Sequence, residues 1–278
     1  LWLGYVTWQK DYAPPPAPVV ATSQTVAQPR TTELPALPSD GTTATAAATP
    51  ATATPAATAE SAANAATIRV RTDVLDLTLS TQGGEFQTAD LLKYPLVKNN
   101  PDVPVRLFNS QPGDGLFLAR SGLRAADGRS EPTHLAIFQS AATEYRLEDG
   151  QDEVTVPLTW TDGQGLTVTK SYTFRRGSYA VPIRYEVVNQ SPTDWKAASY
   201  LQLVRHYVPV SRSMFDVESY AYRGPAIYNG KAYRKLSVED EEDRVYQASF
   251  AGGWMAAMQH HFVAAAVPPV GSSYDYQL

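Results

Sequence analysis

One stretch, Glu153–Asn189, constrains what this chain can fold into more than any other. Apolar and polar residues alternate along it with a period of two, in three runs separated by Gly-containing turns: 154–160, 166–174 and 179–187. Strict alternation of β-branched and aromatic residues between such turns is typical of antiparallel strands with one buried face. The pattern therefore predicts a three-stranded meander, with Phe174 and Ile183 on its buried face.

Short alternating or apolar runs on both sides of the meander predict further strands. They are 68–79, 105–108, 116–119, 134–139, 143–147, 195–210, 219–228, 233–236 and 273–277. The first slips in phase at Thr72-Asp73, which predicts a bulge or a bend, and Phe86–Tyr94 fits either a strand or a short helical turn. The acidic run 239–243 fits a solvated loop or a helix start better than a cation site. Because no long amphipathic helix is present, we predict a mainly β fold.

The first 66 residues differ in composition from the rest. Leu1–Trp8 is apolar and rich in Trp and Tyr, which concentrate where a membrane helix leaves the bilayer. We expect residues 1–12 to be the end of a transmembrane helix, with a frayed terminus and the tail of a signal peptide as alternatives. Residues 13–66 are rich in Ala, Pro and Thr, so we expect a disordered linker rather than a stalk with O-linked sugars. Residues 67–278 then form the folded domain.

Charge and composition exclude several classes of function. The formal net charge is -5 at pH 7, without the clustered Lys and Arg that phosphate binding needs, which argues against nucleic acid as a partner. The chain has no cysteine, so disulfides, thiol catalysis and Cys-based metal sites are excluded. The sequence stops directly after the strand predicted at 273–277, and we therefore expect the β fold to be truncated at its C-terminus.

The sequence offers little catalytic apparatus, and none of the common hydrolase, metal or phosphate-binding motifs is found. His260 and His261 would point to opposite faces of a strand, so both rings cannot easily bind one metal. Trp160 and Tyr172 are in phase with the apolar face and fit the core better than a sugar or peptide groove. Two acid pairs fit turns better than catalysis: Asp73 with Asp76, and Asp149 with Asp152. We predict no catalytic, cofactor-binding or metal-binding residues, no cofactor and no enzyme.

Three stretches together resemble the large periplasmic domain of the Gram-negative YidC membrane protein insertase family. They are Ile68–Gly84, Thr169–Val181 and Gly252–Gln259, the last followed closely by Phe262. Their order and spacing match the family across 67–278, and the expected membrane-helix end and linker match what precedes them.

The resemblance implies a two-sheet antiparallel β-supersandwich of the galactose-mutarotase-like group. It implies that residues 1–12 are the periplasmic end of a transmembrane helix, that 67–278 is periplasmic, and that the full-length protein is a multi-pass protein of the cell inner membrane. The family inserts and helps fold inner-membrane proteins, alone or with the Sec translocon, through membrane helices that would lie beyond Leu278. This segment would be a docking module for the Sec translocon and its accessory complex, while nascent membrane proteins would bind the missing membrane core.

Two other classes of function remain open. The mutarotase-like group suggests a carbohydrate-binding or aldose-epimerase-like sandwich, with His206 and an acidic partner as first candidates, although no spacing supports such a pair. A secreted structural or adhesive sandwich on a Pro/Thr stalk is the other class. Calorimetric titration with monosaccharides tests the sugar hypothesis, because it predicts saturable heat where a docking module predicts none.

Overall fold

The computed structural model describes residues 34–35, 65–98, 100–126, 129–209 and 221–278. The chain divides into two compact units, Leu1–Glu33 and Leu34–Leu278, and the described residues all belong to the second. The expected membrane-helix end (1–12) and nearly all of the expected linker (13–66) lie outside the described residues.

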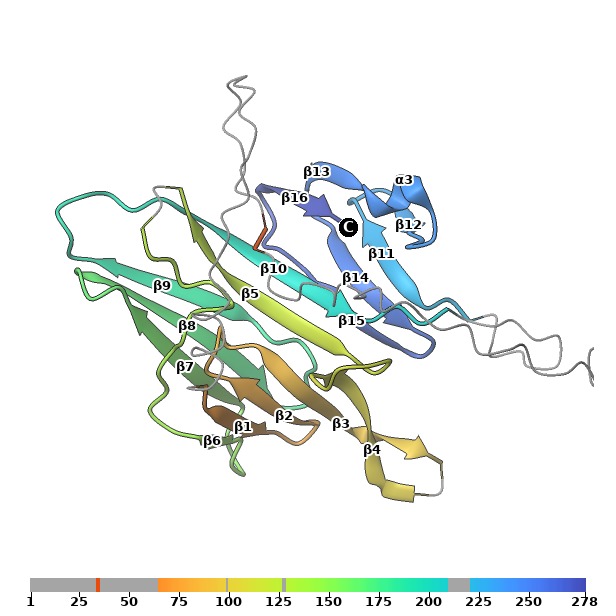
Figure 1. Ribbon diagram of the computed structural model, residues 1–278. Coiled ribbons are helices and arrows are strands. Elements are labelled where there is room, and N and C mark those ends of the chain that lie inside the picture. The colour runs from red at the N-terminus through yellow and green to blue at the C-terminus, as the bar shows by residue number, and fades with distance from the viewer. Residues whose placement is uncertain (1–33, 36–64, 99, 127–128, 210–220) are drawn as a thin grey trace, which may run out of the picture. The chain divides into compact units, whose positions relative to one another are not determined.

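Strands dominate the described part of the chain, as the alternation predicts (Figure 1). They are β1 (Thr67–Arg71), β2 (Leu75–Ser80), β3 (Phe86–Val97), β4 (Asn100–Asn109), β5 (Phe117–Ala125), β6 (Glu144–Arg146), β7 (Glu153–Thr161), β8 (Leu166–Arg175), β9 (Ile183–Asn189), β10 (Ala197–Arg205), β11 (Gly224–Tyr228), β12 (Tyr233–Lys235), β13 (Gln247–Ala251), β14 (Trp254–Gln259), β15 (Phe262–Ala266) and β16 (Ser273–Gln277). Among the described residues there is one short helix, α3 (Glu241–Arg244). It is capped by Asp240, whose side chain accepts a hydrogen bond from Glu242 N at 2.9 Å. The acidic run is therefore a helix start.

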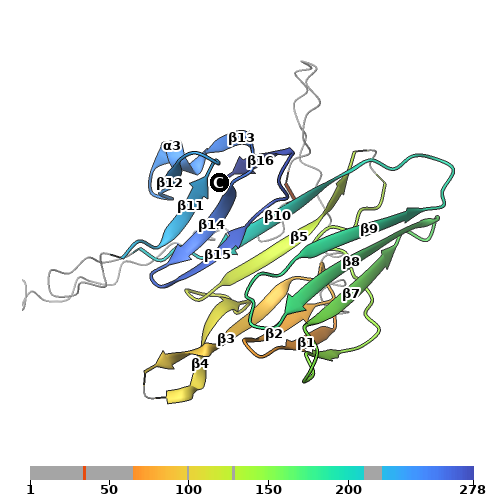
Figure 2. The ribbon, with the colours of Figure 1, turned by 180° about the vertical axis from the view of Figure 1, so that it is seen from behind.

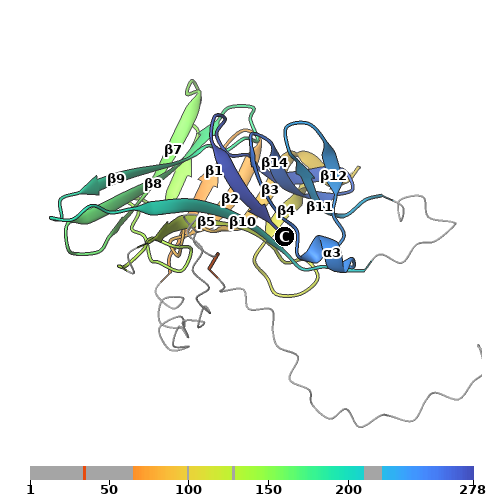
Figure 3. The ribbon, with the colours of Figure 1, turned by 90° about the horizontal axis from the view of Figure 1, so that it is seen from above.

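The described strands form four sheets. The largest has the order β10-β5-β4-β3-β2-β1-β6 and is antiparallel except for the parallel β1–β6 pair. The others are the β7-β8-β9 meander, a four-stranded sheet in the order β12-β11-β14-β15, and the β13–β16 pair. The meander and the four-stranded sheet lie on opposite sides of the views from behind and from above (Figures 2 and 3).

The meander predicted from Glu153–Asn189 is confirmed. β8 pairs antiparallel with β7 along its length and with β9 on its other edge. Phe174 is buried and Ile183 is half-buried against the main core, so the predicted face is correct. The third strand begins at Ile183 rather than at Tyr179, because Pro182 has no N–H with which to continue the ladder.

The phase slip within 68–79 is a hairpin turn rather than a bulge or bend in one strand. β1 and β2 are separate strands that pair antiparallel. Thr72 closes the turn between them, because its Oγ1 accepts hydrogen bonds from Val74 N at 3.2 Å and from Leu75 N at 3.0 Å. Side-chain bonds of this kind stabilise tight turns, so the prediction of a single strand over 68–79 is wrong.

The strand predicted at 134–139 is also wrong. Ile137 makes an isolated bridge with Gln82, at the turn after β2, and Gln139 makes one with Thr159 of β7. The segment thus connects two sheets and belongs to neither ladder. The ambiguous stretch Phe86–Tyr94 is a strand, the first part of β3.

The main core lies between β1–β3 and the meander, where Tyr172 is buried and Trp160 half-buried, as predicted. A row of aromatic rings leads from it toward the four-stranded sheet. The ring centroids are 5.3 Å apart for Tyr172–Phe86, 5.8 Å for Phe86–Phe108 and 4.8 Å for Phe108–Phe117. Phe117 in turn packs with buried alanines of β14 and β15. The meander and the four-stranded sheet therefore pack on the seven-stranded sheet, and the mainly β sandwich class is confirmed.

Candidate functional site

The β3–β4 pair extends past the other strands of the seven-stranded sheet as a two-stranded arm, at the lower right of Figure 1. β2 pairs with β3 as far as Leu91. Beyond Leu91 the described pairing of β3 is with β4, in the register Pro95↔Pro104 and Val97↔Asn100. The described residues of this part, 93–98 and 100–104, are called the arm below.

The arm exposes apolar side chains. Burial alternates along β3 from Thr88 to Leu92, as one buried face requires, whereas all residues from Lys93 to Lys98 are exposed. Leu96 keeps 64% of its surface exposed, Val97 58% and Val103 44%. Exposed apolar residues that gather on one element mark interaction surfaces.

A groove of about 760 Å³ runs between the arm and the β14–β15 hairpin. Its walls include Tyr94 and Val103 from the arm, and His261 and Phe262 from the hairpin. The rings of Tyr94 and Phe262 meet edge to face, with centroids 5.6 Å apart. A concave, largely apolar surface with a few polar groups is the usual form of a binding site.

An ion pair fixes the base of the arm. The Arg106 guanidinium on β4 donates two parallel hydrogen bonds to the Asp90 carboxylate on β3, from Nε at 2.7 Å and from Nη2 at 2.8 Å. These bonds raise the pKa of Arg106. Bidentate pairs constrain geometry as well as contribute energy, so the arm leaves the sheet in a defined direction.

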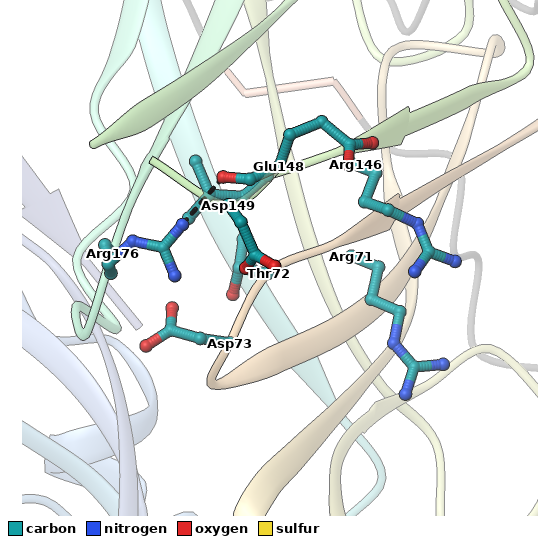
Figure 4. Close-up of a pocket in the computed structure, with 8 residues that line it drawn as sticks. Arg71, Thr72, Asp73, Arg146, Glu148, Asp149 and Arg176 are labelled. Carbon is teal, nitrogen blue, oxygen red and sulfur yellow. Dashed lines mark hydrogen bonds between the residues drawn. The ribbon is translucent and has the colours of Figure 1, made fainter. Parts of the chain in front are cut away.

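A second hollow, of about 200 Å³, is lined by charged side chains from the β1–β2 turn, the segment after β6 and the end of β8 (Figure 4). Arg176 donates from Nη2 to the Glu148 carbonyl at 2.8 Å. Asp73 accepts a hydrogen bond from Gly177 N at 3.0 Å. The charged groups of this hollow hold three turns together, which is a structural role.

Of the four acids that we expected to fit turns, Asp73, Asp149 and Asp152 lie in turns or bends, whereas Asp76 lies within β2. Asp76 is held by Arg69 at 2.7 Å and by Arg71 at 3.3 Å. Asp73 and Asp149 line the polar hollow together. Catalysis by either pair gains no support from these positions, and the absence of catalytic residues stays a prediction.

The sequence interpretation missed a buried cation in the meander. Lys170 is in phase with the apolar residues of β8 and is fully buried. Its Nζ donates hydrogen bonds to the carbonyl oxygens of Gly83 at 2.6 Å and Ser121 at 2.9 Å. Burial lowers its pKa to about 7, although the negative charge of Glu85 opposes this shift. One side chain thus joins the meander to β5 and to the turn after β2.

A buried histidine lies near this cation. The Nδ1 atom of His134 is 2.7 Å from the Tyr200 hydroxyl, and its Nε2 has no hydrogen-bond partner among the described residues. Burial lowers its pKa to about 4, helped by the positive charges of Arg120, Lys170 and Arg124. The imidazole is therefore neutral at pH 7 and part of the sandwich interior.

The remaining histidines do not form a site. His206 Nε2 lies 3.7 Å from Asp114 Oδ1, but both side chains are exposed and line neither hollow, so this geometry does not favour an epimerase. His260 and His261 form the turn between β14 and β15 with their rings stacked 3.7 Å apart, so the prediction that they point to opposite faces is wrong. A two-residue hairpin turn needs positive φ, and His260 has φ of 26°. The described residues contain no cluster of three or more His, Asp or Glu side chains placed to hold a metal ion.

The comparison with known proteins gives the family. Residues 67–278 match the family model described as the YidC periplasmic domain. The chain belongs to the YidC periplasmic domain family. The three stretches that suggested this resemblance lie in β1–β2 with the following turn, in β8 with its following turn, and in β14.

Relatives in this family match most of the chain. The "Membrane protein insertase YidC" of Methylococcus capsulatus is 41% identical over 263 residues, which cover 94% of this chain and 46% of that protein. The protein of the same name from Thioalkalivibrio sulfidiphilus is 37% identical over 275 residues, 96% of this chain and 47% of that protein. The chain therefore spans about half the length of these YidC relatives. No helix within the described residues is long and apolar enough to cross a membrane.

Proposed function

We propose that this chain is the periplasmic docking module of an inner-membrane insertase that inserts and helps fold membrane proteins, alone or with the Sec translocon. The observation that carries the proposal is the match of 67–278 to the YidC periplasmic domain family, with relatives named membrane protein insertases. Insertion itself is assigned to the remainder of such a protein, because the chain covers about half of those relatives.

Each segment has a part in this proposal. Residues 1–12 are the periplasmic end of an anchoring helix and 13–66 are a linker whose coil of ~54 residues reaches roughly 40 Å. Residues 67–278 are the periplasmic β unit that contacts the Sec translocon and its accessory complex, and they carry no enzymatic activity. The groove beside the β14–β15 hairpin supports a docking role, because it is a largely apolar concave surface that the fold itself leaves open.

Deletion of 67–278 from the full-length protein tests the proposal. The intact protein should co-purify with the Sec accessory complex, whereas the deletion variant should lose that complex and still insert membrane proteins. Deletion of 36–64 is the matched control, because it shortens the linker and leaves the β unit intact, and it should retain the complex. Equal recovery of the accessory complex with and without 67–278 would refute the docking role.

A further inference from the structure

The arm carries apolar side chains on both of its faces. Successive side chains of a strand point to opposite faces, and Leu96 and Val97 are successive residues of β3 that are both mostly exposed. Tyr94 and Val103 add further exposed apolar surface on the two strands. A protruding ribbon with apolar side chains on both faces loses all of this exposed apolar surface when it enters the outer layer of a bilayer.

The backbone of the arm also favours lipid over an added strand. Pro95 and Pro104 lie opposite each other in the register of β3 and β4. Neither has an N–H, so at these two positions the arm offers no donor to an incoming peptide strand. The same lack of donors lowers the cost of moving the backbone into an apolar layer, where unpaired N–H groups are expensive.

The charges of the arm complement an anionic surface. Lys93 and Lys98 are exposed and bracket the apolar stretch of β3, and Asp102 is the one acidic residue between positions 93 and 104. Two lysines and one aspartate give the arm a net charge of +1. Lysine side chains lay their apolar stems along a lipid surface with the ammonium at the phosphates, and Tyr94 suits the headgroup layer.

From these observations we propose that the arm is a membrane-binding element for an anionic phospholipid bilayer. Leu96 and Val97 enter the upper acyl region, Tyr94 lies among the headgroups, and Lys93 and Lys98 contact lipid phosphates. The position of the Asp90–Arg106 pair at the base sets the angle of entry. That a bilayer lies within reach rests on the proposed function; the affinity of the arm for lipid does not.

The absence of cysteine allows a direct test with the 278-residue chain. A single-cysteine variant, Val97→Cys, is labelled with an environment-sensitive fluorophore and mixed with vesicles of phosphatidylcholine and phosphatidylglycerol. Its emission should shift to the blue and be quenched by nitroxide-labelled lipid. The same label at Val270→Cys, another exposed valine, should show neither change. Equal behaviour of the two labels would overturn the proposal.

Partition measurements with unlabelled variants give the second readout. Leu96→Ser with Val97→Ser should lower the partition coefficient on anionic vesicles about tenfold, through lost apolar burial. The matched pair Val245→Ser with Val270→Ser should leave it unchanged, since both valines are exposed elsewhere. Circular dichroism and melting temperature show that each variant is folded. Unchanged partition of the arm variant would overturn the proposal.

Charge is tested separately. Lys93→Gln with Lys98→Gln should lower partition about tenfold on anionic vesicles at low salt, and should have no effect on purely neutral vesicles. The apolar residues 1–8 are common to all variants, so a difference reports the arm. The vesicles contain no protein, so loss of lipid binding and loss of Sec docking are separate outcomes.

Discussion

Replacement of Lys170 by Met should change how the free energy of unfolding depends on pH. Burial lowers the pKa of Lys170 to about 7 in the folded chain, from 10.5. Below pH 7 both states hold the proton, and the full cost of the buried charge is present. Between pH 7 and about pH 10 the unfolded state holds more protons than the folded state, so stability rises with pH, at up to about 1.4 kcal/mol per pH unit.

Urea denaturation at pH 7, 8 and 9 measures this effect. The stability of the natural chain minus that of Lys170→Met should increase by about 2 kcal/mol from pH 7 to pH 9, because Lys170 is half-protonated at the lower end. The difference in unfolding free energy at any single pH is less informative. Met also leaves the Gly83 and Ser121 carbonyls without their donor, which costs about 1–3 kcal/mol of stability for each carbonyl. Other titrating groups are shared by both proteins and cancel. A difference that stays constant with pH would refute the assigned pKa.

Three further substitutions test the core, a turn and the buried histidine. Phe174→Ala should cost about 3–5 kcal/mol of unfolding free energy through lost burial and a cavity, and Thr173→Ala much less; equal melting temperatures would show that the buried face is misassigned. Gly83→Ala should cost more than about 3 kcal/mol, because φ is 64° and a Cβ would lie 2.4 Å from backbone atoms of His134. At Gly163, with φ of 72° and open space around it, the same change should cost only about 1 kcal/mol, and similar losses at both glycines would contradict the clash. The natural chain should lose about 2–3 kcal/mol between pH 7 and pH 4.5, as His134 takes up a proton more readily unfolded than folded; His134→Gln should flatten that slope, and an unchanged slope would show that another group causes it.

The meander was predictable because all its determinants are local. Period-two alternation and Gly-containing turns lie within Glu153–Asn189, and each strand pairs with its neighbour in sequence. Lys170 escaped the same reasoning, since its partners Gly83 and Ser121 belong to distant segments. A lysine at a buried position of β8 is tolerated because backbone carbonyl oxygens outside the meander accept its hydrogen bonds.

The arm and the hairpin turns were harder to predict, for different reasons. The pairing of β3 with β2 stops at Leu91, and the rest of β3 is therefore an exposed arm. Where this pairing stops depends on tertiary structure. At Thr72 a side chain closes a turn that the apolar pattern alone presents as a slip within one strand. His260 and His261 carry no Gly or Asn signal for a two-residue turn, so the alternation of a strand was extended through them.

The pairing of β5 with β10 sets an order of folding. β5 meets β3 and β4 at single register pairs, Phe86↔Ala119 and Asn109↔Phe117, whereas β10 pairs with it along its whole length. During synthesis the meander is therefore complete before the principal partner of β5 exists. Such non-local pairing is the slow part of folding, and until Ala197–Arg205 arrives β5 is an open strand edge. That interval is when the nascent chain is most prone to pair with the wrong strand.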